Sequence, residues 1–321
     1  MTTTTYEPAA PADLRRRGIR LGDVLFKGIA VAAALAATAL LGLIAWKVFD
    51  LALPAIKDFG LSFIWTNAWN PVTESFGALI FIYGTVVTSF IALVLATPIS
   101  IAIALFLTEI APRRVAGSIA TMVELLAAIP SVVLGLWGIL VFGPWVRDHL
   151  EPWLQSVLGF LPMFSGSPNQ AGILPAALVL TIMIIPITSA ICRELFIRVP
   201  RELTDGALAL GSTRWESIRG VMLAYAAPGI AAAVLLGLGR AFGEAIAVNQ
   251  MIGNHNAIPS SWFEPGDSLG SKIASSYQGA STHVEASSLL YLAAILMVIS
   301  LAANVTAQFI VVKFERARRA V

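Results

Sequence analysis

Two charged residues stand inside a long apolar stretch of the chain. Within the sequence LLGLGRAFGE, Arg240 and Glu244 are four residues apart, a spacing that brings both side chains to one face of a helix. The planar, permanently charged guanidinium suits a tetrahedral oxyanion. A carboxylate beside it would orient it and keep an anion from binding too tightly to leave. We predict that Arg240 and Glu244 line the path of an anion; a buried ion pair that only fixes the orientation of a helix is the alternative.

The element that carries this pair is expected to lie in a membrane. Of the 321 residues, 57% are hydrophobic and 12% are charged, whereas a soluble globular chain has about 25% charged residues. This composition excludes a lone soluble enzyme. Arg240 is expected about 22 Å along its span from Tyr225, near mid-depth. An arginine there costs about 2.5 to 3.5 kcal/mol, so its side chain should face a wet cavity or a partner protein.

The hydropathy pattern predicts an all-α polytopic membrane protein with six transmembrane helices. A crossing needs roughly 20 mostly apolar residues, and the segments that meet this requirement are 25–49, 76–108, 118–146, 172–192, 225–252 and 286–312. Pro98 and Pro130 are expected to kink or break the long second and third segments. The external tryptophans are expected in an interfacial belt: Trp65, Trp69, Trp145 and Trp153. One cysteine and three scattered histidines lack metal-ligand spacing, so we predict neither a metal nor a cofactor.

The distribution of basic residues predicts that both termini are cytoplasmic. Most of the 21 Lys and Arg residues fall before the first span, after the last span, or in the loops that follow the second and fourth spans. This asymmetry follows the positive-inside rule for a multi-pass protein of a bacterial plasma membrane, so we read the basic clusters as topology signals and predict no nucleic-acid partner. The expected divisions are a disordered basic tail over 1–24, a first span with an external segment over 25–75, a transmembrane domain over 76–312, and a basic tail over 313–321.

The segment 193–224 is the most polar part of the chain after the N-terminal region. Pro200 favours the start of a helix and Gly211 its end, while Thr213 and Glu216 form the pattern of a capping box for a second helix. Two short helices with a sharp joint at Gly211 are therefore predicted, with apolar side chains such as Trp215 in a loop that faces water. These helices either lie on the membrane surface or dock a cytosolic protein.

The loop resembles the EAA loop of binding-protein-dependent ABC importer permeases. Asp205-Gly206-Ala207 stands where that family has Glu-Ala-Ala, and Gly211 follows at the family's interval. The family's closing Ile-x-Leu-Pro is represented by the segment 221–224, VMLA. Three further stretches, FGALIFIYGT, AIPSVVLGLWG and GRAFGE, are similar to the phosphate-specific transport (Pst) permeases, their C subunit in particular.

This resemblance implies a type I importer fold and a set of partners. The expected partners are a homologous second permease subunit (A subunit), a cytosolic ATPase dimer and an external phosphate-binding protein. The loop residues implied in ATPase coupling are Asp205, Gly206, Ala207, Gly211 and Trp215. The residues expected along the phosphate pathway are Arg240, Glu244, Ser131, Thr85 and Asn304. Serine, threonine and asparagine side chains in transmembrane helices more often hold neighbouring helices together by hydrogen bonds.

The chain lacks a nucleotide-binding motif of its own. No Gly-x4-Gly-Lys-Ser/Thr sequence occurs, so it is expected not to be an enzyme but a transport subunit whose energy comes from a partner ATPase. The predicted function is passage of inorganic phosphate by alternating access. One arginine does not distinguish tetrahedral oxyanions, so a permease for sulfate or molybdate is one alternative. An ATP-independent anion channel is another, although such a channel has no use for the 193–224 loop.

Overall fold

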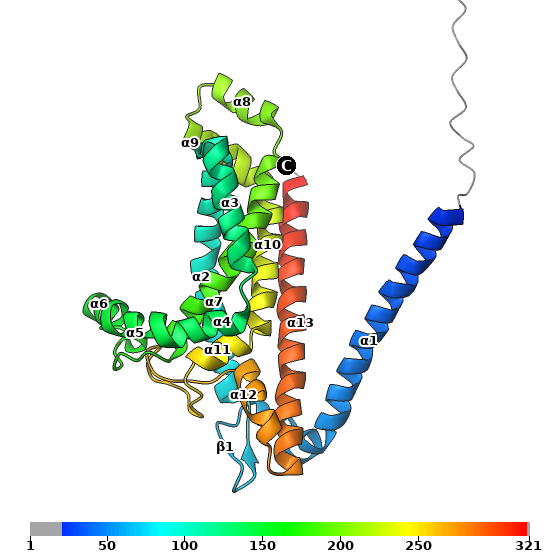
Figure 1. Cartoon of the computed structure of the whole chain (residues 1–321), viewed down its shortest axis with the longest axis vertical. Coiled ribbons are helices and arrows are strands. Elements are labelled where there is room, and N and C mark those ends of the chain that lie inside the picture. The colour runs from blue at the N-terminus through cyan, green and yellow to red at the C-terminus, as the bar shows by residue number, and fades with distance from the viewer. Residues whose placement is uncertain (1–20, 320–321) are drawn as a thin grey trace, which may run out of the picture. The chain divides into compact units, whose positions relative to one another are not determined.

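The computed structural model describes residues 21–319, and most of this part of the chain is helical (Figure 1). Six of its helical segments are long and apolar enough to cross a membrane: 24–64, 79–110, 131–158, 173–197, 214–243 and 283–309. The predicted class, an all-α membrane protein with six such segments, is confirmed. Of the disordered tail expected over 1–24, residues 1–20 lie outside the described residues, whereas 21–24 are helical, so the prediction is wrong for that part. The side chains of residues 313–319 are also outside the described part.

The chain up to Lys47 and the chain from Val48 onward form separate units. The long helix α1 (Leu21–Phe59) runs through both. In the first unit its apolar side chains are exposed, among them Leu35 and Leu41, which is the pattern of a helix surrounded by lipid. In the second unit Ala52 and Ala55 are fully buried. Phe59, the last residue of α1, packs against Phe63 in the short helix Gly60–Ile64.

Four long helices form the body of the second unit. These are α2 (Leu79–Leu105), α7 (Ile173–Ile197), α10 (Leu223–Gly243) and α13 (His283–Arg319), which run side by side in Figure 1. Small residues such as Ala92 and Ala96 on α2 are fully buried against α7, so the helix backbones can approach closely. Pro98 does not end α2, which continues through a π-helical turn to Ile110.

The predicted third span is wrong in its bounds. Helix α3 (Arg113–Ala127) packs beside α7 and ends before Pro130, so the expected helix over 118–146 is divided there. After the break come α4 (Ser131–Trp137), α5 (Gly143–Trp145) and α6 (Glu151–Leu158), joined by π-helical turns. In Figure 1 this second part runs across the direction of α2, α7 and α13. Proline is disfavoured inside a helix because it removes a hydrogen bond and clashes with the preceding turn.

The two ends of the helical body carry different structures. At one end, called the α8 end below, lie α8 (Arg201–Ala209) and α9 (Arg214–Ser217). At the other, the α12 end, lie α11 (Ile246–Met251), α12 (Leu269–Ser276) and a two-stranded antiparallel hairpin. The hairpin consists of β1 (Trp69–Asn70) and β2 (Ser75–Phe76), with Trp69 opposite Phe76.

One of the four expected belt tryptophans lies elsewhere. Trp69 is 8% exposed and packs edge-on against Phe76 and Phe81. Trp65, Trp145 and Trp153 remain exposed. Trp69 is therefore part of the core at the α12 end, because the hairpin folds its side chain inward against α2.

Candidate functional site

The Arg240–Glu244 pair lies where the fifth long helix is interrupted. Arg240 is in the last turn of α10, which ends at Gly243; Glu244 is extended, and α11 begins at Ile246. The prediction of one continuous helix over 225–252 is therefore wrong. The pair forms nonetheless: Arg240 Nη2 lies 3.9 Å from Glu244 Oε2. Glu244 Oε1 accepts a hydrogen bond of 3.3 Å from the Ala247 backbone N–H, so the carboxylate also caps α11.

The Arg240 guanidinium is incompletely satisfied. Its distance to the Glu244 carboxylate exceeds that of a hydrogen bond, and its Nε is buried with no hydrogen-bond partner among the described residues. The Arg240 side chain is 35% exposed, whereas that of Glu244 is 9% exposed. A charged donor at this position in a membrane protein needs water, an anion or another polypeptide beside it. Glu244 therefore holds the Arg240 guanidinium only loosely, and the guanidinium remains able to bind an oxyanion.

Glycines around Arg240 differ in what surrounds them. A Cβ at Gly237 would lie 3.0 Å from Ile184 Cγ2 and 3.2 Å from Thr188 Oγ1, so Gly237 allows close packing of α10 on α7. A Cβ at Gly239 would lie 3.9 Å from Asn304 Oδ1, and one at Gly243 would meet nothing within 4 Å in the described part of the chain. Open space therefore lies on the Gly243 side of the pair.

Of the other predicted pathway residues, Asn304 lies beside the same turns of α10. Its Nδ2 donates to Ser300 O at 2.9 Å, and its Oδ1 is the atom nearest Gly239. Ser131 is the first residue of α4. A Cβ at Gly135, one turn further on, would lie 2.9 Å from the Ala247 Cα, so α4 adjoins α11 rather than Arg240 itself.

Thr85 has a structural environment. It is 4% exposed, its Oγ1 donates to Phe81 O at 2.8 Å, and the same atom accepts the Leu269 backbone N–H at 2.9 Å. The hydroxyl thus joins the beginning of α12 to α2. Its one hydrogen is already donated to Phe81 O, so none is left to bind a passing anion.

Thr85→Val should destabilise the protein without a selective effect on transport. The substitution keeps the side-chain shape but leaves the buried Leu269 N–H unpaired, which costs about 1 to 3 kcal/mol. Thermal unfolding of the purified complex measures the loss. Transport per assembled complex should stay within twofold of the unchanged protein; a much larger selective loss would place Thr85 on the pathway.

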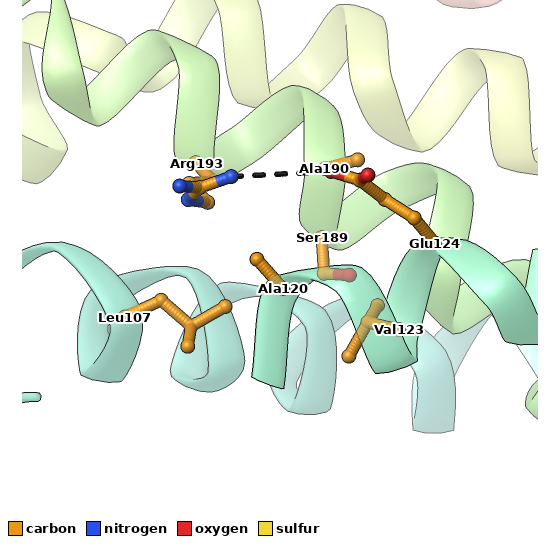
Figure 2. A pocket seen from close by; sticks show the side chains of 7 residues that line it. All are labelled: Leu107, Ala120, Val123, Glu124, Ser189, Ala190 and Arg193. Atoms are coloured by element: carbon orange, nitrogen blue, oxygen red, sulfur yellow. Dashed lines mark ion pairs between the residues drawn. The ribbon is translucent and has the colours of Figure 1, made fainter. Parts of the chain in front are cut away.

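A second arginine–glutamate pair lies near the α8 end. Arg193 Nη1 on α7 is 4.0 Å from Glu124 Oε1 on α3, and Figure 2 shows the two side chains pointing toward each other above Ser189 and Ala120. The cavity between them has a volume of about 10 Å³, room for at most one water molecule. A larger groove of about 350 Å³ between α2, α6 and α7 has only apolar and aromatic lining residues. Neither cavity fits an oxyanion as well as the surroundings of Arg240 do.

The loop at the α8 end has the local structure that the sequence predicts. Gly211 ends α8 with φ +90°, and Thr213 and Glu216 form the capping box of α9. Leu210 is 92% exposed and Trp215 62%. Asp205 and Gly206 are also exposed, and Ala207 is half-buried. An apolar, solvent-facing surface on two short helices is typical of a docking site.

Sequence reasoning missed one residue at this end. Arg214 of α9 donates to the backbone carbonyl of Glu109, and its Nη2 lies 3.9 Å from Glu109 Oε2. The sequence predicts only a topology signal for Arg214, as one of the basic residues that follow the fourth span. The two residues are 105 positions apart, so no local spacing could connect them.

The family model of the "binding-protein-dependent transport system inner membrane component" matches residues 96–319. A phosphate transport system permease protein PstC of Pasteurella multocida is 43% identical over 266 residues, covering 82% of this chain and 83% of the relative. A PstC of Mesorhizobium japonicum is 39% identical over 307 residues, covering 94% of both chains.

Among solved structures, the chain is similar to one chain of a bacterial alginate ABC transporter in complex with an alginate-bound periplasmic protein. The TM-score is 0.58 at 19% identity, with 91% of this chain and 98% of that chain covered. At this identity the likeness shows the fold alone, and it confirms the predicted ABC importer permease fold.

Proposed function

Because the chain belongs to the binding-protein-dependent transport system inner membrane components and, within them, to the PstC permeases, we propose that it is the transmembrane permease subunit of a phosphate importer. The observation that carries this proposal is the Arg240 guanidinium: partly exposed, 3.9 Å from Glu244, and with a buried Nε that lacks a partner among residues 21–319. Phosphate passes Arg240 by alternating access. It is released because Glu244 competes with it for the guanidinium.

Arg240 remains 35% exposed among residues 21–319, so a second protein completes the site. A homologous permease subunit that packs over the open side of Gly243 would enclose Arg240 in a shared cavity. Such an arrangement excludes lipid from the charged group and lets water or phosphate reach it. Asn304, beside Gly239, is the polar residue of α13 best placed to contribute to this cavity.

The energy enters at the α8 end. We place this end, with both termini, on the cytoplasmic side of a bacterial plasma membrane, as the distribution of Lys and Arg predicts. A cytosolic ATPase docks on the exposed side chains of α8 and α9, among them Leu210 and Trp215. Since α9 continues through a π-helical turn into α10, movement of this loop is transmitted directly to the helix that carries Arg240. An external phosphate-binding protein delivers substrate at the α12 end.

Uptake by the reconstituted complex tests the proposal. The permease, the second permease, the ATPase and the binding protein are placed in proteoliposomes, and uptake of radiolabelled phosphate is measured with ATP and without it. We expect uptake that requires ATP. Excess unlabelled phosphate should suppress this uptake, whereas sulfate and molybdate should leave it unchanged. Suppression by sulfate or molybdate instead identifies another oxyanion, and uptake without ATP identifies a channel.

A further inference from the structure

A buried charged cluster lies at the α12 end, outside the site described above. Lys272 is 9% exposed, Asp267 1% and Glu285 6%. Burial raises the pKa of Asp267 to about 6, although hydrogen bonds from Ser271 and Ser268 act in the opposite direction, and burial lowers the pKa of Lys272. A buried charge is costly unless it is paired and hydrogen-bonded. Each of the three has its own hydrogen-bond partner: Ser268 N–H donates to Asp267, Ser281 donates to Glu285, and Lys272 donates to Asn256.

The Lys272 ammonium joins parts of the chain that are far apart in sequence. Its Nζ donates to Asn256 Oδ1 at 3.1 Å and lies 5.2 Å from the ring centre of Trp69 and 5.7 Å from that of Phe81. The favourable charges come from Asp267, before α12, and Glu285, in the first turn of α13. One side chain thus joins α12 to the hairpin, to α2 and to the 253–268 loop.

The opposite part of α12 touches the interruption between α10 and α11, residues 243–246, which we call the Glu244 corner. A Cβ at Gly270 would lie 3.2 Å from Ala245 Cβ and 3.5 Å from Glu244 O. The next residue, Ser271, makes a hydrogen bond of 3.0 Å to Asn249 Oδ1 on α11. The position of α12 therefore limits where the corner, and with it the Glu244 carboxylate, can lie relative to Arg240.

We propose that Lys272 is a positioning residue for the Arg240–Glu244 site, acting through α12 and Gly270. The inference rests on the proposed function of that site. Without the ammonium, α12 loses its common contact with the hairpin, α2 and the 253–268 loop, and the corner gains freedom to move. The Glu244 carboxylate then no longer stays at its distance from Arg240. ATP hydrolysis by the partner continues, but fewer phosphate ions cross for each ATP.

The test is Lys272→Met in the complete complex in proteoliposomes. Methionine keeps an unbranched side chain beside the rings of Trp69 and Phe81 but removes the charge. We expect the number of ATP molecules hydrolysed per phosphate delivered to rise about threefold or more, as substitutions that act through packed neighbours do. Lys272→Arg keeps the charge, so its ratio of ATP hydrolysed to phosphate delivered should lie between that of Lys272→Met and that of the unchanged complex. The matched control is Lys57→Met, which removes the same charge from an exposed position near the same end and should leave the ratio unchanged.

A merely structural role gives a different result. It lowers the amount of complex recovered and reduces uptake and ATP hydrolysis in proportion, so an unchanged ratio overturns the proposal. If the Lys272→Met complex does not assemble, Gly270→Ala tests the proposal. The added Cβ must displace Ala245 by a few tenths of an ångström. The number of ATP molecules hydrolysed per phosphate delivered must then rise again. Failure of the proposed function is seen separately, as absence of phosphate uptake by the unchanged complex.

Discussion

Replacing Arg240 by Gln should reduce ATP-dependent phosphate uptake about a hundredfold or more. The guanidinium can offer a tetrahedral oxyanion two charge-assisted hydrogen bonds, and losing two bonds of about 1.5 kcal/mol each corresponds to roughly a hundredfold. Uptake of radiolabelled phosphate by proteoliposomes measures the effect. Because Gln removes a charge that is costly in a membrane-spanning helix and Arg240 is paired only at 3.9 Å, the complex should assemble in normal amounts.

Two further variants separate the parts of this prediction. Arg240→Lys keeps the charge but not the planar pair of donors, so it should retain part of the uptake. Arg147→Gln removes one positive charge from an exposed side chain that pairs with Asp148 and should have no effect on uptake. Normal uptake by the assembled Arg240→Gln complex would show that phosphate does not pass this residue. The pair would then only orient α10.

Gly211→Val should disconnect the ATPase from transport. Gly211 has φ +90° between α8 and α9, a conformation that costs a β-branched residue about 1 to 3 kcal/mol. The joint should open and turn α9 away from α8, so that Leu210 and Trp215 no longer present one surface. We expect uptake to fall at least about tenfold. Less ATPase should also copurify with the permease, as gel analysis of the purified complex would reveal.

Gly211→Asn is the informative companion to this change. Asparagine tolerates positive φ better than other side-chain-bearing residues, so it should keep most of the uptake. Gly117→Ala serves as the control because Gly117 lies inside α3 with no atom of the described chain within 4 Å of the Cβ position. Should Gly211→Val recruit the ATPase and drive uptake normally, the docking surface would have to lie elsewhere than on α8 and α9.

Several features of the fold followed from sequence because they depend on neighbouring residues. Apolar runs of sufficient length predicted six spans, since a helix that crosses lipid must satisfy its backbone internally. The capping box of Thr213 and Glu216 and the joint at Gly211 were predicted correctly because capping and positive φ are local properties. The predicted family is also confirmed by the comparisons.

Predictions about the ends of helices were less accurate. Pro98 and Pro130 look alike in sequence, yet α2 continues past Pro98 whereas the chain turns at Pro130. The break at Glu244 follows Gly243 and has no proline at all. Whether a helix continues past such a residue depends on the partners that its freed backbone groups find, and these partners come from other helices.

The sequence by itself determined that an arginine and a glutamate form a pair in a six-span protein, because hydropathy and the spacing of four residues are properties of one segment. Only the tertiary structure decided that Asn304 lies beside Gly239, that the Thr85 hydroxyl accepts the Leu269 backbone N–H, and that the Lys272 ammonium lies over the rings of Trp69 and Phe81. These contacts join residues tens to hundreds of positions apart. They arise from the packing of whole helices, for which a single sequence carries no local signal.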